Sequence, residues 1–204
     1  MKVIIANTSH IAYAVTISTT ITEAAKVRGT GIAKRTPEYI SSKIEKGNAV
    51  IALEKDKFAG FCYIETWGHG NFVANSGLIV HPDYRGLGLA KKIKQKIFEL
   101  SREKFPDAKL FGITTGLAVM KINSDLGYKP VTFSELTTDE SFWKGCQTCK
   151  NYDVLQRTNQ SMCLCTGMLY DPDVKENKSN KIKDKTFKRL KTIKQNLLLK
   201  KNKK

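Results

Sequence analysis

The feature of this sequence that most constrains its fold is a predicted strand followed by a glycine-rich turn and a long helix. Apolar residues recur at a spacing of three and four over residues 87–105, which predicts an amphipathic helix. Gly86 and Gly88 stand at its start, where the lack of a Cβ lets a bulky anion approach the backbone. The first N–H groups of a helix lack partners and carry partial positive charge, and this helix has no acidic residue before Glu99. The turn, residues 85–90, is therefore predicted to cradle a pyrophosphate.

Other interpretations of this turn fit the residues less well. A plain helix cap would explain the glycines, but not the accompanying Arg85 and Ala90 or the approach through Pro82. A Rossmann fingerprint needs another glycine spacing and a crossover connection, whereas the preceding strands have the short linkers of hairpins. The Walker pattern is absent.

The rest of the sequence predicts a mixed α/β (α+β) domain with one sheet. Strands are expected at residues 2–6, 49–53, 58–67, 72–80, 110–114 and 128–133. Helices are expected at residues 9–28, 37–47, 87–105 and 117–126. Because short polar linkers join three successive strands, the sheet should be largely antiparallel, with helices flanking it. Residues 134–172 are expected to form a loop region that contains cysteines.

Positive charge is concentrated at one end of the chain. Residues 174–204 hold 13 basic and two acidic residues, so they carry +11 of the net charge of +16 and leave +5 for residues 1–173. This distribution argues against a uniformly basic nucleic-acid-binding domain. It favours a globular domain at residues 1–135, a cysteine-containing extension at 136–173 packed on it, and a basic tail at 174–204.

The basic tail has apolar residues at a spacing of three and four, namely Phe187, Leu190, Ile193 and Leu197. A basic amphipathic helix there would suit a nucleic acid, an anionic surface or an acidic partner, and the alternative is a solvated tail that docks on its own domain. No apolar run approaches the roughly 18 residues that a bilayer span needs. The apolar run at residues 3–6 is too short for a signal peptide, so we expect a cytoplasmic protein without membrane insertion.

Arg85, Gly88 and Ala90 match the pattern R-x-x-G-x-A. With the strands and helices around it, this run resembles motif A of the GNAT superfamily of N-acetyltransferases over roughly residues 1–135. The resemblance implies a GNAT-like acyl-CoA N-acyltransferase fold and acetyl-CoA or succinyl-CoA as the acyl donor. It also implies a splay between the fourth and fifth strands, through which the thioester enters the sheet. The residues that it places along the donor are Val80, Arg85, Gly86, Leu87, Gly88, Leu89, Ala90 and Lys91.

The tyrosine that often acts as the catalytic acid in members of this superfamily is replaced in this chain. Family members often carry a tyrosine four residues before a glycine–aromatic pair, and this tyrosine protonates the leaving thiolate. In this chain the pair is Gly127-Tyr128 and the corresponding residue is Asn123, which can donate a hydrogen bond but cannot supply a proton. Either another group is the acid, or the thiolate leaves without one, since the pKa of a thiol is only about 8.5.

The attacking amine must lose a proton, and Glu65 on the third strand is the first candidate for the base. The alternative for Glu65 is an exposed carboxylate without a catalytic role. Glu65 and Asn123 are thus the predicted catalytic residues.

The residues around Arg35, followed later by Trp143-x-x-Cys146-x-x-Cys149, resemble short stand-alone N-acetylglutamate synthases. This resemblance implies that Arg35 binds the carboxylate of a small-molecule amine acceptor through a bidentate pair, with glutamate as the best single guess. An exposed Arg35 before a helix cap is the alternative. Competing functions are a protein or ribosomal N-acetyltransferase that docks through the basic tail, and a non-catalytic CoA- or RNA-binding module. The sequence leaves a homodimer open.

Five cysteines are present, and four of them lie within 20 residues: Cys146, Cys149, Cys163 and Cys165. In a reducing compartment this pattern favours thiols or a metal over disulfides. The spacing is compatible with a tetrahedral structural zinc, and free core thiols are the alternative. Cys62 is predicted to be buried packing.

Overall fold

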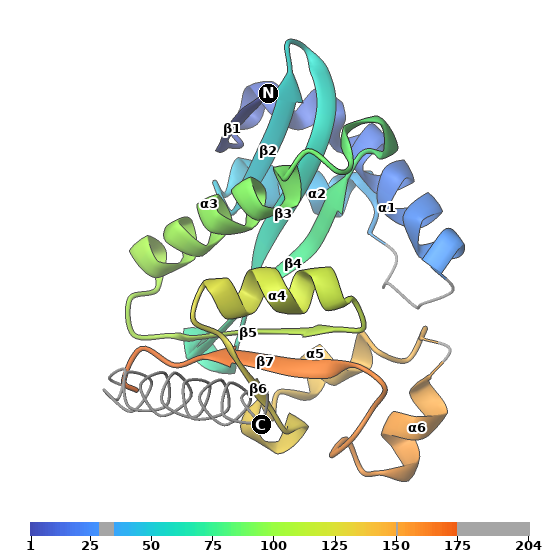
Figure 1. Ribbon diagram of the computed structural model, residues 1–204, viewed down its shortest axis with the longest axis vertical. Coiled ribbons are helices and arrows are strands. Elements are labelled where there is room, and N and C mark those ends of the chain that lie inside the picture. Colours follow the sequence, from blue (N-terminus) through green and yellow to red (C-terminus); the bar gives the residue numbers. More distant parts are fainter. Residues whose placement is uncertain (29–34, 150, 175–204) are drawn as a thin grey trace, which may run out of the picture. The chain divides into compact units, whose positions relative to one another are not determined.

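A mixed sheet of seven strands organises the computed structural model, which describes residues 1–28, 35–149 and 151–174 (Figure 1). The strands are β1 (Lys2–Ile5), β2 (Ala49–Glu54), β3 (Lys57–Trp67), β4 (Phe72–Val80), β5 (Lys109–Thr114), β6 (Lys129–Val131) and β7 (Thr166–Tyr170). Their order in the sheet is β1-β2-β3-β4-β5-β7-β6, and only the β4–β5 pair of these strands is parallel. The predicted single, mixed and largely antiparallel sheet is confirmed.

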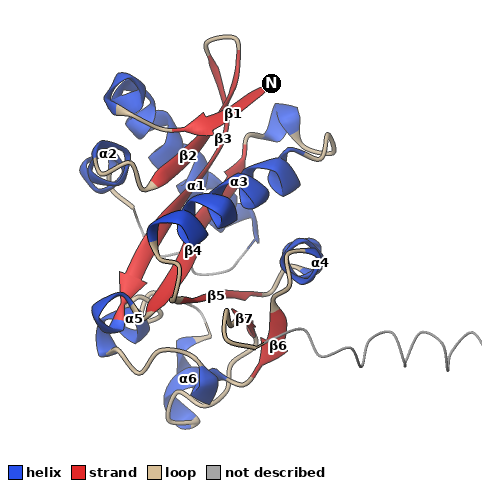
Figure 2. Cartoon of the chain, turned by 90° about the vertical axis from the view of Figure 1, so that its left-hand side faces the viewer, coloured by secondary structure: helices blue, strands red, loops and turns tan. Residues whose placement is uncertain are grey.

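Helices cover both faces of this sheet. The α-helices are α1 (Ala14–Arg28), α2 (Pro37–Glu45), α3 (Leu89–Lys104), α4 (Leu117–Asp125), α5 (Glu140–Lys144) and α6 (Tyr152–Arg157). Short 3-10 helices are η1 (Thr8–Tyr13), η2 (Gly68–Gly70), η3 (Pro82–Tyr84) and η4 (Phe133–Glu135). Figure 2 shows α2 and α3 on opposite sides of β2 and β3. None of the described helices combines the length and the apolar character that a bilayer crossing requires.

The alternation of side chains along β3 decides which helix meets which face. Phe61 and Tyr63 are buried in one apolar cluster with side chains of α1 and α2. Cys62 and Ile64 point the other way, into a second cluster with the apolar side chains of α3. The sheet therefore has an α3 face and an α1/α2 face, and neighbouring residues of one strand serve different faces.

The prediction that residues 134–172 form a loop region is wrong. This segment contains α5, α6 and β7, and β7 pairs antiparallel with both β5 and β6. Its five residues are too few for a clear alternation, and its partners lie far away in the sequence, so only the sheet register reveals it. The compact unit that holds the sheet runs from Met1 to Pro172, and residues 175–204 of the basic tail lie outside the described residues.

β4 leaves β5 soon after the two strands begin. They pair only from Phe72 opposite Lys109 to Ala74 opposite Phe111. The splay expected between the fourth and fifth strands is thereby confirmed. β4 also carries a bulge, because Phe61 pairs with Ile79 whereas Tyr63 pairs with Ser76.

Gly77 in this bulge should not tolerate a side chain. Its φ is +63°, and a Cβ there would lie 2.2 Å from Cε1 of Tyr63. We expect Gly77→Ala to lower the free energy of unfolding in urea by about 3 kcal/mol, from the left-handed conformation and overpacking together. Gly112→Ala is the matched control, because nothing lies within 4 Å of its Cβ position. Equal stability of the two variants would contradict a closely packed bulge.

Candidate active site

The glycine turn, residues 85–90, leaves the start of α3 open. Gly86 and Gly88 have φ values of +78° and +72°, and no atom lies within 4 Å of a Cβ built on either of them. No side chain caps α3, and its first turn has no acidic residue. Leu89 is 2% exposed and anchors the helix start in the core. The free N–H groups and positive dipole of α3 therefore face unobstructed space, which suits a bound phosphate group.

Polar contacts hold the residues on either side of this turn. Arg85 Nε donates a hydrogen bond to the carbonyl oxygen of Val80, at the end of β4, over 3.3 Å. Lys91 Nζ lies 2.9 Å from Oδ2 of Asp125 on α4, and this contact lowers the pKa of Asp125. An anion that reaches Lys91 would have to compete with Asp125.

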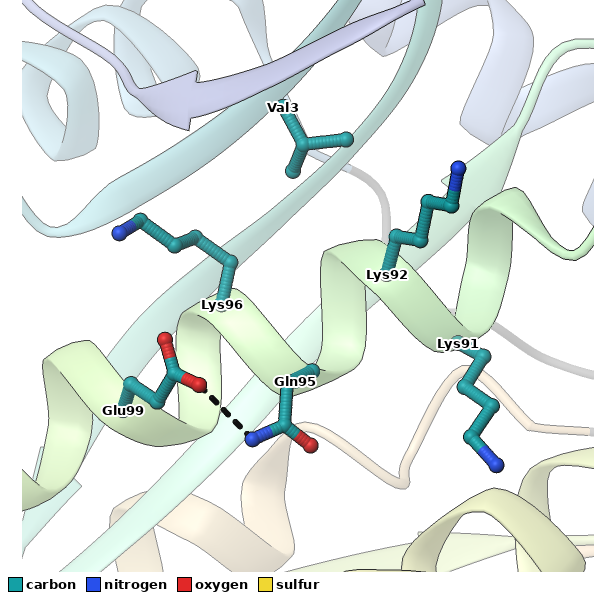
Figure 3. A pocket seen from close by; sticks show the side chains of 6 residues that line it. All are labelled: Val3, Lys91, Lys92, Gln95, Lys96 and Glu99. Atoms are coloured by element: carbon teal, nitrogen blue, oxygen red, sulfur yellow. Dashed lines mark hydrogen bonds between the residues drawn. The ribbon is translucent and has the colours of Figure 1, made fainter.

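A hollow lies along α3, next to Val3 of β1 (Figure 3). It has a volume of about 390 Å³ and is lined by Val3, Lys91, Lys92, Gln95, Lys96 and Glu99. Three lysines make it cationic, and the Gln95 amide donates to Glu99 across one edge. Neither Glu65 nor Asn123 lines this hollow, so it is not the place where those two residues would act.

Arg35 and Glu65, 30 residues apart in sequence, are brought together between α2 and β3. Arg35 Nη2 lies 3.5 Å from Glu65 Oε2, and Arg35 Nε donates to the hydroxyl of Tyr63 over 2.5 Å. The Tyr39 hydroxyl donates to Glu65 Oε1, and Lys43 Nζ lies 4.9 Å from the centre of the Tyr39 ring. These five residues, Arg35, Tyr39, Lys43, Tyr63 and Glu65, are called the Arg35 cluster below.

The Arg35 cluster lies beside the point where β4 and β5 part. Glu65 pairs with Ala74 of β4, and Ala74 is the last β4 residue that pairs with β5. Glu65 and Tyr63 are two residues apart in a strand, so both belong to the α1/α2 face. Glu65 is 9% exposed, which is inconsistent with the alternative of an exposed strand carboxylate.

Burial and contacts within the cluster shift the pKa values of its side chains. Burial alone would lower the pKa of Arg35, but the contacts with Tyr63 and Glu65 raise it above its ordinary value. Burial, assisted by Glu65, raises the pKa values of Tyr39 and Tyr63, so both hydroxyls stay protonated. Burial lowers the pKa of Lys43, and Glu65 partly opposes this. The cluster thus brings two basic side chains, Arg35 and Lys43, close to the carboxyl group of Glu65.

Asn123 and Lys94 are two further polar residues that are buried in the structure. Asn123 of α4 is 2% exposed, and its Oδ1 has no hydrogen-bond partner among the described residues. Lys94 is also 2% exposed, with Nζ 5.4 Å from the centre of the Tyr128 ring. Lys94 departs from the amphipathic pattern predicted for residues 87–105, because it is buried together with the apolar side of α3. A signal for this existed, since Lys94 shares a spacing of four and three with Ala90 and Ile97.

Comparison with known families decides the class of this domain. Residues 23–115 match the Acetyltransferase (GNAT) family. The chain contains a GNAT acetyltransferase domain. The matched segment includes Arg35, Glu65, the glycine turn and the divergence of β4 from β5. Among curated protein sequences, none is significantly similar to this chain.

Solved structures share the fold of this GNAT domain. N-acetylglutamate synthase from Neisseria gonorrhoeae, complexed with coenzyme A and N-acetyl-glutamate, superposes with a TM-score of 0.59 at 16% identity over 83% of this chain. This chain spans only 34% of that enzyme. Rv2747 from Mycobacterium tuberculosis, in complex with CoA and NLQ, has a TM-score of 0.58 at 15% identity over 84% of this chain and 99% of its own. The Salmonella typhimurium protein yncA, with its cofactor acetyl-CoA, has a TM-score of 0.58 at 14% identity over 87% of this chain and 96% of its own.

Three of the four clustered cysteines lie in one apolar cluster. Cys146, Cys163 and Cys165 are half-buried and pack against a core that includes Trp143 of α5 and Leu155 of α6. Burial and the neighbouring cysteines raise the pKa of Cys146 to about 11 and that of Cys165 to about 12, which keeps them as thiols. Among the described residues no group of three or more side chains is placed to hold a metal ion, so the structure does not support the zinc interpretation. Cys62 is fully buried, as predicted.

Proposed function

We propose that this GNAT chain transfers an acetyl group from acetyl-CoA to the α-amino group of an amino acid such as glutamate, by direct attack in a ternary complex. The observation that carries the proposal is the 3.5 Å contact between Arg35 and Glu65 beside the divergence of β4 and β5. It places a cation that suits a carboxylate next to a carboxylate that suits an amine. Succinyl-CoA is the alternative donor.

The donor is proposed to lie on the α3 face. The amides of the glycine turn would hold the pyrophosphate, because two glycines with positive φ leave them unobstructed. From there the pantetheine arm would pass the carbonyl of Val80 toward the opening between β4 and β5. The Neisseria and Mycobacterium structures named above hold CoA, and the Salmonella structure holds acetyl-CoA, which supports this choice of donor.

The acceptor is proposed to bind on the α1/α2 face. Its carboxylate would compete with Glu65 for Arg35, with Lys43 as a second cation. Arginine suits this role because its planar guanidinium pairs with a carboxylate through two hydrogen bonds. Glu65 would then be released from Arg35 to accept a proton from the ammonium group of the acceptor, directly or through water. The neutral amine attacks the thioester carbonyl through the opening in the sheet.

Arg35→Met tests this assignment through the acceptor rather than the donor. We expect the KM for glutamate to rise about 10- to 100-fold, because a hydrogen bond to a charged group contributes about 1.5–3 kcal/mol. The KM for acetyl-CoA should stay within about threefold, and thiol release with an amine that lacks a carboxylate should be the same in both proteins. Release of the CoA thiol with an amino-acid panel, with acetyl-CoA and succinyl-CoA in parallel, is the measurement.

Arg157→Met is the matched control, since Arg157 is exposed and pairs only with Asp153 among the described residues. It should leave every constant unchanged. If no amino acid releases thiol while a basic protein or peptide does, the protein N-acetyltransferase alternative replaces this proposal. Docking of a nucleic acid or an acidic partner by the basic tail stays a prediction.

A further inference from the structure

Lys94 is a buried cation without a partner. Its side chain is 2% exposed, yet within the described residues Nζ makes no hydrogen bond or ion pair and only lies over the ring of Tyr128. Burying an unpaired ammonium group is costly, and an apolar side chain would fill the same space more favourably. Asn123, with its buried and unpartnered Oδ1, repeats the anomaly on α4. A buried, unpartnered Asn123 Oδ1 and a buried lysine without an ion pair among the described residues together indicate a polar ligand on this face.

The surroundings of Lys94 place it at the divergence of β4 from β5. Tyr128, whose ring lies under Nζ, donates a hydrogen bond to Asn75 Oδ1 over 3.2 Å. Cys62, the other group that acts on the Lys94 charge, donates from Sγ to the carbonyl oxygen of Ser76 over 3.3 Å. Asn75 and Ser76 are the two residues that follow Ala74, where pairing of β4 with β5 stops. Lys94 therefore faces the opening from the α3 face, opposite Glu65 on the other face.

We propose that Lys94 is the catalytic residue that donates a proton to the sulfur of CoA as it leaves the acyl group. The inference rests on the proposed function, because it needs the thioester to enter between β4 and β5. Asn123 is a positioning residue. Its Oδ1 accepts a hydrogen bond from an amide N–H of the pantetheine arm and so holds that arm in place. The acid thus comes from α3, and not from the α4 position that Asn123 occupies.

The step balances without a further reactant. The nitrogen of the neutral amine forms a bond to the carbonyl carbon, and the carbon–sulfur bond breaks with its electron pair on sulfur. The nitrogen, positively charged after the attack, loses its second proton to water as the amide forms. A proton moves from Lys94 Nζ to that sulfur and leaves a neutral amine on Lys94. The proton that the acceptor lost resides on Glu65. Water returns Lys94 to the ammonium form and takes the proton from Glu65 before the next turnover.

The acidity of Lys94 suits this task. Burial lowers the pKa of Lys94 to about 8, and Cys62 partly opposes the shift. That value is close to the pKa of about 8.5 of a free thiol, so the proton passes between groups of similar acidity. The groups that face Lys94 are Cys62 from β3 and Tyr128 after α4, and burial raises the pKa values of both. Both stay neutral near pH 7–8, so neither neutralises the ammonium group.

Lys94→Met removes the proton and keeps the length of the side chain. The first readout is the ionisation of the CoA thiol in the binary complex, followed by the ultraviolet absorbance of the thiolate over a pH series. In the wild-type complex the ammonium group should lower the thiol pKa by about one unit or more from its free value of about 8.5. In Lys94→Met the thiol should ionise at or above the free value. Lys96→Met, on the same helix and half-exposed, should behave like the wild type.

The second readout is the pH profile of kcat. Lys94 acts as an acid in its ammonium form, so the wild-type kcat should fall as pH rises through the pKa of Lys94. We expect Lys94→Met to lose that alkaline limb, to lower kcat about 10- to 100-fold, and to leave the KM for acetyl-CoA within about threefold. A thiol can leave without an acid, because its pKa is low. The fall in kcat should therefore lie in the lower part of the range that is usual for general acid catalysis. Lys94→Gln, which cannot ionise, serves if the methionine variant does not fold.

Some outcomes would overturn the inference. If wild type and Lys94→Met bind CoA with the same thiol ionisation, Lys94 does not act on the sulfur, while the proposed function still stands. An acetyl group found on Lys94 after incubation with acetyl-CoA alone would show a nucleophile in place of an acid. If the wild type binds no CoA at all, the proposed function fails first. The binary complex needs no acceptor, so a wrong choice of acceptor leaves this test intact.

Discussion

Gly88→Glu is expected to abolish the rise in melting temperature that acetyl-CoA gives the wild-type protein. Gly88 has a φ of +72° and open space at its Cβ position, so the new carboxylate would project into the region proposed for the pyrophosphate. A residue other than glycine pays about 1–2 kcal/mol in this left-handed conformation. Repulsion between the carboxylate and the phosphates adds to that, and we expect CoA to bind at least about 100-fold more weakly.

A matched control separates the site from backbone strain. Gly70 has a φ of +90° and equally open space, but it lies in η2 between β3 and β4. Gly70→Glu introduces the same carboxylate with the same kind of strain away from α3. It should lower the stability of the apo protein in a similar way and keep the full response to acetyl-CoA. An undiminished response in Gly88→Glu would refute the assignment of the glycine turn.

Glu65→Gln is expected to lower kcat about 100- to 1,000-fold near neutral pH while acetyl-CoA binds as before. The amide keeps the shape of Glu65 and an oxygen that accepts from the Tyr39 hydroxyl, but it cannot take a proton from the acceptor. General base catalysis typically contributes about 10²–10⁴-fold. The kcat of the variant should climb with pH, since a rising fraction of the amine is then already neutral. Steady-state thiol release over a pH series is the measurement.

The same variant has an expected effect on KM with a separate physical cause. Glu65 lies 3.5 Å from Arg35 and so competes with the acceptor carboxylate. Removing its charge should lower the KM for glutamate or leave it unchanged, in contrast to Arg35→Met, which raises it. Glu45→Gln, at the exposed end of α2, is the control. A kcat within threefold of the wild type would mean that Glu65 only holds Arg35.

The structural features that could be predicted from the sequence depend on residues close together in the chain. The glycine turn and the start of α3 depend on backbone conformations within ten residues, so spacing alone indicates them. The predicted helix start at residue 37 is confirmed for the same reason, because Thr36 caps α2 and Pro37 is its first residue. The meander β2-β3-β4 follows from short linkers, which leave antiparallel pairing as the simple connection. In each case the prediction used neighbours in the chain.

The features that sequence reasoning missed depend on distant neighbours. β7 is a strand because it pairs with an edge of β5 on one side and an edge of β6 on the other. The five residues of β7 by themselves do not predict a strand. Lys94 resembles the exposed lysines beside it until the helix is placed on the sheet. The cysteine spacing is compatible with zinc, but spacing cannot show how the side chains converge.

The sequence by itself determined the order of the main strands and helices before residue 134, the glycine turn and the concentration of positive charge in residues 174–204, because these follow from local conformational preference and composition. Only the tertiary structure decided that Arg35 and Glu65 meet on one face of the sheet while Lys94 and Asn123 are buried on the other. The reason is that burial and strand register are set by the packing of elements far apart in the chain, and the alternation along β3 sends adjacent residues to opposite faces.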